Sequence, residues 1–127
     1  MTHLIYAVCI LILDDKLPDG KAVGIARKND PKSFGLLGGK IDISDSTPEA
    51  AAIRECKEES GLILSRPVEV YRREYDKGIV ITYMGDTTGE PATQPNEAEC
   101  RWCSFDELIA GRFGEYNIDL FKKLGLK

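Results

Sequence analysis

The pattern of apolar and polar positions predicts two strands near the start of the chain. Residues 4–13 are apolar at every position and rich in β-branched side chains, which is typical of a strand buried on both faces of a sheet. A Pro-Asp-Gly turn at residues 18–20 precedes a second strand at residues 21–27, where apolar and polar positions alternate more clearly. The Asn-Asp-Pro sequence at residues 29–31 is expected to end that strand.

A glycine-rich run and a helix follow. Residues 34–39 read Phe-Gly-Leu-Leu-Gly-Gly, and the three glycines predict a loop or a tight turn. Further along, Ser46 or Thr47 can cap a helix, a proline suits its first turn, and Gly61 can end it. We therefore predict a helix over Pro48–Ser60.

The second half of the chain predicts further strands and two short helices. The expected elements are strands at residues 68–75, 78–85 and 101–104, a turn at 76–78, a polar loop at 86–96, and helices at 105–110 and 118–124. Because strands outnumber helices and the helices are dispersed between them, the expected class is α+β, with a mixed sheet and helices packed on its faces.

Composition and charge narrow the class of protein. The 127 residues are 43% hydrophobic and 30% charged, which suits a single globular domain over residues 1–127. The formal net charge is −4, so the chain lacks the basic excess that binding to duplex nucleic acid requires. The longest apolar run, residues 4–13, is too short to cross a bilayer and does not resemble a signal peptide. We therefore expect a cytoplasmic protein that does not associate with a membrane.

The four cysteines, at positions 9, 56, 100 and 103, fit no disulfide framework. Cys100 and Cys103 would point to opposite faces of a strand, and no second Cys-x-x-Cys pair completes a zinc site. We expect small buried thiols.

The predicted helix carries a face of carboxylates. At ~100° per residue, Glu55, Glu58 and Glu59 fall within an arc of about 100°. A different arc of the same helix forms an apolar face for the sheet, made of Ala52, Ile53 and Cys56.

Like charges at this spacing destabilise a helix, so the carboxylate face needs an explanation. Arg54 can pair with Glu58, four residues later, whereas Glu55 and Glu59 have no cation within reach in the sequence. A bound divalent cation is one explanation, because clustered carboxylate oxygens suit Mg²⁺ or Mn²⁺. A solvated acidic face is the other.

The segment from Gly39 to Leu62 resembles the signature of the Nudix hydrolases, G-x5-E-x7-R-E-U-x-E-E-x-G-U, in which U is a bulky apolar residue. The second half of the signature is matched by Arg54, Glu55, Glu58, Glu59, Gly61 and Leu62, with Cys56 as a small apolar substitute. The first half departs from it. Asp45 stands in place of a glutamate, and eight residues instead of seven, 46–53, separate it from the arginine. Leu37 also replaces a proline that is common before the two glycines.

The resemblance implies the Nudix α/β/α sandwich around a mixed sheet. It also implies hydrolysis of nucleoside diphosphates linked to another moiety, with Mg²⁺ or Mn²⁺ as the cofactor. Carried over by position, Glu55, Glu58 and Glu59 would be metal ligands, and Glu55 or Glu58 would help to activate water. Arg54 would hold a glutamate in place, and the Gly39 backbone would contribute to the metal site.

The resemblance also suggests residues outside the helix. Glu97, five residues before Trp102, is expected as a further metal ligand in preference to Glu99. The candidate contacts to the substrate and its phosphates are Gly38, Lys40, Arg27, Arg73 and Phe34. The alternative for both groups is that they are ordinary loop, surface or strand residues.

The identity of the substrate stays open on the sequence alone. The short chain, the Phe-Gly-Leu-Leu-Gly-Gly-Lys run and the spacing from Glu97 to Trp102 look most like the small nucleoside triphosphate pyrophosphohydrolases, including those that remove oxidised nucleotides. The alternatives are a hydrolase of ADP-ribose, dinucleoside polyphosphates or nucleotide sugars, and a Nudix-like module that binds nucleotides without hydrolysing them. Tyr71, Tyr75 and Tyr83 can stack on a base, although strand tyrosines are more often core or edge residues. We expect a small-molecule nucleotide as the partner, and a monomer or homodimer.

Overall fold

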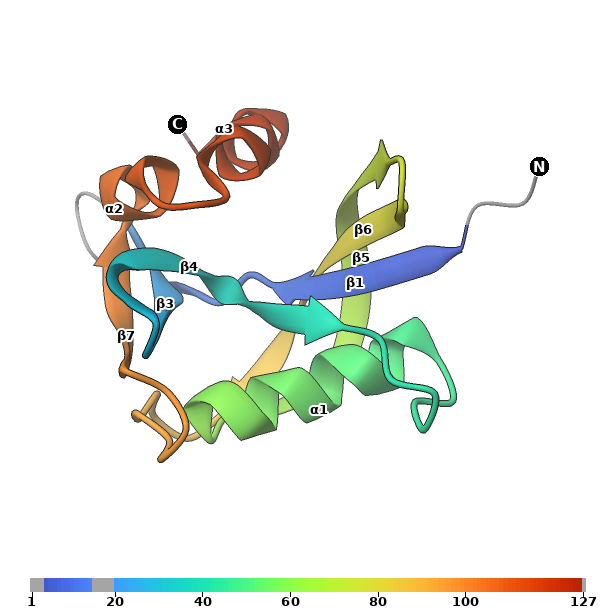
Figure 1. Ribbon diagram of the computed structural model, residues 1–127, viewed down its shortest axis with the longest axis horizontal. Coiled ribbons are helices and arrows are strands. Elements are labelled where there is room, and N and C mark those ends of the chain that lie inside the picture. The colour runs from blue at the N-terminus through green and yellow to red at the C-terminus, as the bar shows by residue number, and fades with distance from the viewer. Residues whose placement is uncertain (1–3, 15–19, 127) are drawn as a thin grey trace.

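The computed structural model describes residues 4–14 and 20–126 (Figure 1). The strands in this part of the chain are β1 (Ile5–Ile10), β2 (Leu13–Asp14), β3 (Lys21–Arg27), β4 (Asp30–Lys40), β5 (Ile63–Tyr75), β6 (Gly78–Thr88) and β7 (Glu99–Ser104). The helices are α1 (Pro48–Ser60), α2 (Phe105–Ala110) and α3 (Gly114–Lys123). No helix among the described residues has the length and apolar content needed to span a membrane.

The strands form a mixed sheet in the order β2-β3-β4-β1-β6-β5, and β7 also pairs with β3. Strand β1 runs parallel to β6 and antiparallel to β4. Strand β4 links the two halves of the sheet, because Leu36 pairs with Gly24 of β3 whereas Gly38 pairs with Cys9 of β1. This long strand then leads into the loop that precedes α1.

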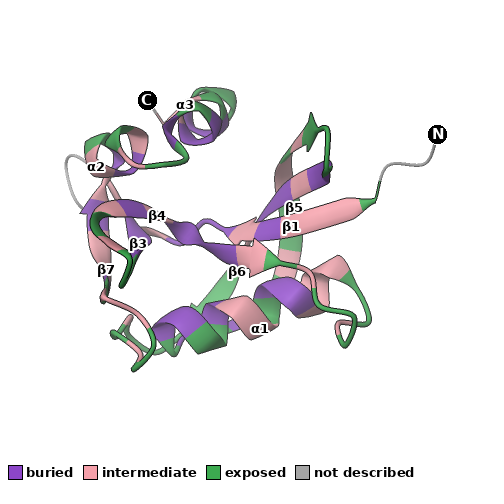
Figure 2. Ribbon diagram, in the orientation of Figure 1, coloured by how far each residue is buried: buried purple, intermediate pink, exposed green. Residues whose placement is uncertain are grey.

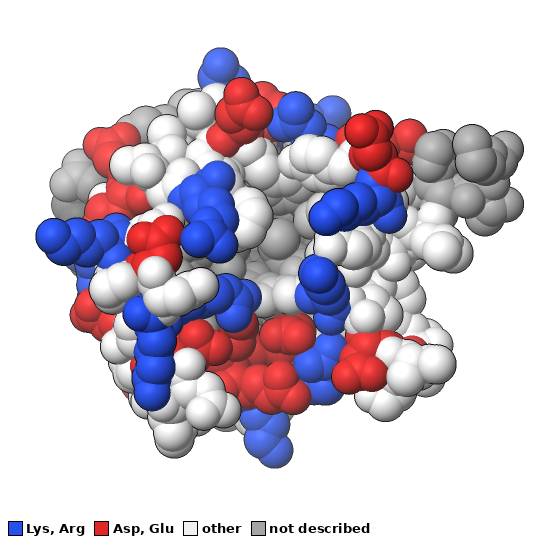
Figure 3. Space-filling model, viewed as in Figure 1, with Lys and Arg blue, Asp and Glu red and all other residues white. Residues whose placement is uncertain are grey.

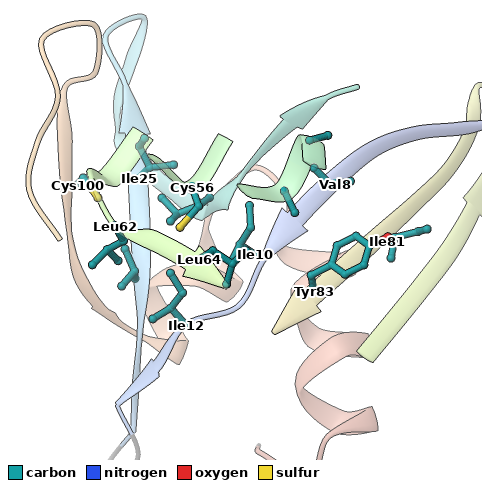
Figure 4. Packing of buried hydrophobic residues seen from close by; sticks show 14 of the residues in the cluster. Val8, Ile10, Ile12, Ile25, Cys56, Leu62, Leu64, Ile81, Tyr83 and Cys100 are labelled. Atoms are coloured by element: carbon teal, nitrogen blue, oxygen red, sulfur yellow. The ribbon is translucent and has the colours of Figure 1, made fainter. Parts of the chain in front are cut away.

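Side chains of the sheet alternate between two hydrophobic clusters, one on each face. Val8 and Ile10 of β1 join Leu64 of β5 in the cluster beneath α1, and Figure 4 shows the side chains of Ile10 and Leu64 next to each other. Cys9 and Leu11 belong to the other cluster, which α2 and α3 cover. Figure 1 shows α1 on one side of the sheet with α2 and α3 on the other, and in Figure 2 the buried side of α1 faces the strands. The predicted α/β/α arrangement, a mixed sheet with helices on both faces, is confirmed.

Helix α1 begins and ends at the residues that the sequence predicted. Thr47 is the N-cap, and its Oγ1 accepts a hydrogen bond from the Ala50 N–H at 3.0 Å. Gly61 ends the helix with a left-handed φ of 78°, and its N–H donates to the Lys57 carbonyl. These local signals fix both ends of the element that carries the carboxylates.

The apolar face of α1 differs from the prediction at one residue. Ala51, Ala52 and Cys56 are fully buried, whereas Ile53 is 38% exposed. Ile53 lies about 100° around the helix from Ala52. Because Ala52 is at the centre of the buried face, Ile53 falls at its edge and is only partly covered.

One prediction about β4 was wrong. Residues 34–39 form part of this strand and not a loop or tight turn. Strand β3 does end at Arg27 as predicted, but the turn that follows it lies at residues 28–29, so Pro31 falls inside β4. The glycines serve close packing here, because a Cβ atom at Gly38 would collide with the Val8 carbonyl oxygen. Pro31 is tolerated because it is the second residue of β4, next to an irregularity in the pairing with β3.

The observed bounds of several other elements differ from the predicted bounds by a few residues. The predicted strand at residues 4–13 is divided into β1 and β2, and the predicted helix at 118–124 begins earlier, at Gly114. Strands β5, β6 and β7 all extend beyond their predicted ranges, whereas α2 has the predicted bounds. Pro18 and Asp19, which belong to a predicted turn, lie outside the described residues.

The cysteines behave largely as expected. Cys100 faces the cluster beneath α1 and Cys103 faces the cluster beneath α2 and α3, so the two thiols lie on opposite faces of β7. All four cysteines are free, and all except Cys9 are buried.

Candidate active site

The most buried acidic side chain of α1 is Glu59, which is 3% exposed and lies where the helix crosses the end of β4. The Gly38 N–H donates a hydrogen bond to Glu59 Oε1 at 2.7 Å. Arg27, at the end of β3, donates from Nη2 to Glu59 Oε2 at 3.3 Å and to the Gly38 carbonyl at 3.4 Å. Helix and sheet are therefore joined at this point by a carboxylate, a backbone amide and a guanidinium.

The pKa of Glu59 is raised from 4.5 to about 8, mainly by burial and in smaller part by the nearby carboxylates of Glu55 and Glu97. The Gly38 N–H and the Arg27 guanidinium lower the pKa of Glu59, but they do not offset the loss of water. The chain itself therefore supplies too little positive charge to keep Glu59 ionised at neutral pH.

Glu55 lies against the backbone of Gly39. A Cβ atom at position 39 would be 2.9 Å from Glu55 Oε1, so a glycine is needed for the carboxylate to lie there. Burial is the main cause of the raised pKa of Glu55, and the Arg54 guanidinium opposes it. The Gly39 position therefore admits the carboxylate that the sequence pattern assigns to the metal site.

Arg54 connects three acidic side chains. Its Nε and Nη2 donate to the two carboxylate oxygens of Asp45 at 2.9 and 2.8 Å. Its Nη1 donates to Glu55 Oε1 at 2.9 Å and to Glu58 Oε2 at 3.2 Å, so the pairing of Arg54 with Glu58 is confirmed. The hydrogen bonds from Arg54 are the main reason that the pKa of Asp45 falls to about 2. The pKa of Arg54 is raised in turn, so this cation stays charged.

A hollow of about 530 Å³ opens beside these carboxylates. It is lined by cations, backbone and one of the glutamates: Arg27, Gly38, Gly39, Lys40, Ile41, Asp42, Ile43, Arg54 and Glu55. Figure 3 shows this face hollowed near its centre, with acidic side chains gathered below the hollow and Lys and Arg side chains around it. The site thus combines carboxylates, which attract cations, with arginine and lysine, which attract phosphate.

Glu97 comes to the same place from the loop before β7. Its Oε1 lies 4.0 Å from Arg27 Nη1, and its side chain is 12% exposed. Glu99 lies on β7 and pairs with Arg101 at 3.2 Å. The structure therefore brings Glu97 to the carboxylates of α1, whereas Glu99 is held elsewhere.

Two predicted substrate contacts are not brought to the hollow. Arg73 of β5 pairs with Asp119 of α3 at 2.8 Å. Phe34 is buried in the cluster beneath α2 and α3, with the Arg101 guanidinium 4.2 Å from its ring centre. The neighbouring candidates Gly38, Lys40 and Arg27 do line the hollow.

None of the three tyrosines that were candidates for stacking on a base lines the hollow. Tyr71 packs edge-on against Tyr116 with ring centres 5.2 Å apart. Tyr83 is buried in the cluster beneath α1. Tyr75 is exposed and lies beside Arg73, 5.4 Å from its guanidinium.

Sequence reasoning missed two ion pairs at this site. Glu59 does have a cation nearby, since Arg27 reaches it from a strand 32 positions earlier. The contact from Arg54 to Asp45 was also not foreseen, although the aspartate stands in the polar loop that enters α1. The only sequence signal for Arg27 is a charged residue that follows five apolar or glycine residues, 22–26, in the same strand.

The donor chemistry of the site fits a hard divalent cation. Among the described residues, no three acidic, histidine or cysteine side chains already enclose a point where an ion would sit. Instead, Arg54 holds Glu55 and Glu58, while Arg27 lies between Glu59 and Glu97. The incompletely compensated charge of Glu59 and the predominance of oxygen donors are what Mg²⁺ or Mn²⁺ requires.

Solved structures of other proteins share the fold of this chain. A MutT structure from work on Aliivibrio salmonicida and Vibrio cholerae has a TM-score of 0.74 and 19% identity, covering 94% of this chain and 95% of that one. The NUDIX domain of Shewanella oneidensis NrtR complexed with ADP ribose has a TM-score of 0.71 and 14% identity, covering 98% and 88%. A C. elegans Ap4A hydrolase binary complex has a TM-score of 0.67 and 17% identity, covering 94% and 95%.

These structures share the fold at low sequence identity, and no curated protein sequence matches the chain. A family model built from sequences does match the chain. The model described as the NUDIX domain matches residues 3–124, which is nearly the whole sequence. The chain therefore belongs to the Nudix hydrolase family.

Proposed function

We propose that this chain, acting as a single domain over residues 1–127, hydrolyses a pyrophosphate bond in a nucleoside diphosphate linked to another moiety. Nucleoside triphosphates and deoxynucleoside triphosphates are the favoured substrates, including oxidised nucleotides removed from the nucleotide pool. The observation that carries the proposal is the partly compensated carboxylate of Glu59 beside a hollow lined by Arg27 and Lys40. Such a site attracts a divalent cation and a polyphosphate together.

Glu55, Glu58, Glu59 and Glu97 would hold Mg²⁺ or Mn²⁺, together with the backbone at Gly39. When bound, the cation would neutralise phosphate charge and lower the pKa of the attacking water. Nudix hydrolases generally use divalent metal ions, and the family match supports this requirement here.

The side chains of the site have separate tasks in the proposed reaction. Glu55 or Glu58 accepts the proton of the water that attacks phosphorus. Arg54 donates hydrogen bonds from Nη1 to the carboxylates of both Glu55 and Glu58. These bonds restrict rotation of the two side chains and so hold the carboxylates in position relative to the substrate. Lys40 and Arg27, on the lining of the hollow, contact the phosphate oxygens.

A panel of nucleotides tests the proposal. The unmodified protein is incubated with dGTP, 8-oxo-dGTP, ADP-ribose, diadenosine polyphosphates and nucleotide sugars, with Mg²⁺ or Mn²⁺, and the products are identified by mass. We expect E58Q and E59Q to abolish turnover while the proteins stay folded. E99Q is the matched control, because Glu99 is a neighbouring acidic residue that pairs with Arg101 away from the hollow. Absence of hydrolysis by the unmodified protein across the panel would refute the proposal.

ADP-ribose or a dinucleoside polyphosphate is the second candidate substrate. It is favoured by the similarity to a NUDIX domain complexed with ADP ribose and to an Ap4A hydrolase. The same panel decides between the candidates, because the preferred substrate has the highest kcat/KM and releases products of different mass.

Metal binding has a test that needs no substrate. We expect the melting temperature to rise when Mg²⁺ or Mn²⁺ is added, because a ligand that binds only the folded state stabilises it. In a variant with Gln at positions 55, 58 and 59 the rise should vanish. An equal rise in that variant would show that the cation binds elsewhere.

A further inference from the structure

Asp45 closes the loop that enters α1. Its N–H donates to the Asp42 carbonyl at 2.9 Å, and its Oδ2 accepts from the Asp42 N–H at 2.8 Å. The Ser44 N–H donates to Asp42 Oδ1 at 3.2 Å, which adds a third hydrogen bond within the same turn. The Asp45 side chain is only 5% exposed although it lies in a polar loop. This carboxylate is therefore held in a defined position before it meets the helix.

The same carboxylate fixes the orientation of Arg54. A guanidinium is planar, and two of its nitrogens are bonded to the two oxygens of Asp45. The plane and the direction of the remaining nitrogen, Nη1, are then set. That nitrogen is the one that donates to both Glu55 and Glu58. A displacement of Asp45 would therefore be transmitted to both carboxylates, of which Glu55 lines the hollow.

We infer that Asp45 is a positioning residue that acts through Arg54 on Glu55 and Glu58, and that its short side chain is matched to the longer loop in front of α1. The effect on turnover rests on the proposed function. The effects on the arginine and on metal affinity do not require hydrolysis.

The match between loop and side chain follows from where the extra residue lies. The helix is regular from Pro48, so the spacing from there to Arg54 is fixed. The additional residue relative to the Nudix signature therefore falls in the loop, at Ser46 or Thr47, and Ser46 is exposed. An aspartate reaches about 1.5 Å less far than a glutamate, the length of one carbon–carbon bond. The extra residue in the loop allows the backbone at Asp45 to lie closer to α1, so the shorter carboxylate still comes within 2.9 Å of Arg54.

Four proteins test the match as a double-mutant cycle: the unmodified chain, D45E, a deletion of Ser46, and D45E combined with the deletion. The deletion leaves the N-cap in place, because Thr47 is the residue that caps α1. D45N tests the positioning role by itself, since it keeps the size of the side chain and the full loop. D86N is the matched control, because it removes an aspartate that also receives two hydrogen bonds from one arginine, Arg66, at an exposed site.

Two readouts do not need a substrate. The first is the NMR signal of the Arg54 Nε–H group in metal-free protein, assigned by its loss in R54K. The second is the dissociation constant of Mn²⁺ measured by calorimetry. We expect D45N, D45E and the deletion each to broaden the arginine signal and to weaken Mn²⁺ binding by about 10- to 100-fold, as is usual when a residue behind a ligand is changed. The combined variant should recover the signal and come within about threefold of the native affinity, and D86N should change neither.

The outcomes separate the parts of the inference. An Mn²⁺ affinity of D45N within twofold of the native value would overturn the positioning role. A combined variant no better than the poorer single variant would overturn the match between loop and side chain. If a nucleotide is hydrolysed, D45N should lower kcat with little change in KM, because the affected carboxylates act on the water and not on substrate affinity. If the unmodified protein hydrolyses nothing, the proposed function fails, whereas the NMR signal and the Mn²⁺ titration still decide this inference.

Discussion

Replacing Glu59 by Gln should make the metal-free protein more stable at neutral and alkaline pH while removing its activity. The side chain is 3% exposed, and its pKa is raised from 4.5 to about 8, mainly by burial. In the unfolded chain the same carboxyl ionises near its ordinary value. Between these two pKa values the native state binds more protons than the unfolded state, so this residue lowers the stability of the fold as pH rises.

The magnitude follows from the two pKa values. With 1.36 kcal/mol for each pKa unit, ionisation of this carboxyl in the unfolded chain, while it stays protonated in the native state, lowers the free energy of unfolding by about 1 kcal/mol at pH 5, about 2 kcal/mol at pH 6 and about 3 kcal/mol at pH 7. A glutamine keeps an oxygen for the Gly38 N–H, but it presents an amide to Arg27 where a carboxylate oxygen accepted a bond. That mismatch subtracts about 1 kcal/mol at every pH. E59Q should therefore be about as stable as the unmodified protein at pH 5 and about 2 kcal/mol more stable at pH 7.

Urea unfolding with EDTA at pH values from 5 to 8 measures this difference. Other titrating groups are common to both proteins, so they cancel in the comparison. E58Q is the control, because Glu58 stands one position earlier on α1 but its side chain is 58% exposed. Its replacement should change stability by less than about 1 kcal/mol at every pH. A stability difference between E59Q and the unmodified protein that does not change with pH would refute the reasoning.

Three further substitutions test other parts of the structure. G39A places a methyl group 2.9 Å from Glu55 Oε1, so the Mn²⁺ affinity measured by calorimetry should fall by at least tenfold. An unchanged affinity would show that the Glu55 side chain can move away freely. Y116F removes the hydroxyl that lies 2.6 Å from Thr82 Oγ1 in the core beneath α3. It should lower the free energy of unfolding, measured with urea, by about 1–3 kcal/mol. A decrease of less than about 0.5 kcal/mol would show that the threonine hydroxyl finds another hydrogen-bond partner. L120A removes most of a fully buried side chain of α3 and should lower the free energy of unfolding by about 2–5 kcal/mol. A decrease as small as that expected for replacing an exposed leucine by alanine would contradict the packing of α3 on the sheet.

Local signals in the sequence were sufficient for α1. Thr47, Pro48 and Gly61 act on the backbone within one turn of themselves, so the ends of the helix could be predicted without knowledge of its neighbours. The same is true of α2, whose first turn is closed by hydrogen bonds between Ser104 and Glu107. Such elements are specified by interactions of short range in the chain.

Strand β4 shows where local reasoning failed. Glycine is unfavourable in a strand when only backbone entropy is considered, and the run at residues 34–39 therefore indicated a loop. The strand forms because Gly38 packs against the Val8 carbonyl and Gly39 packs against Glu55. Neither contact can be inferred from residues that are near in sequence.

The sequence by itself determined the family resemblance, the carboxylate face of α1 and the pairing of Arg54 with Glu58, because a helical period of 3.6 residues fixes which side chains share a face. Only the tertiary structure decided which groups meet that face. It brought Arg27 and Glu97 to Glu59, placed Asp45 on Arg54, and directed Arg73 and Phe34 elsewhere. The physical reason is that strand pairing and helix packing set these distances, so residues that are far apart in the chain meet only once the sheet has formed.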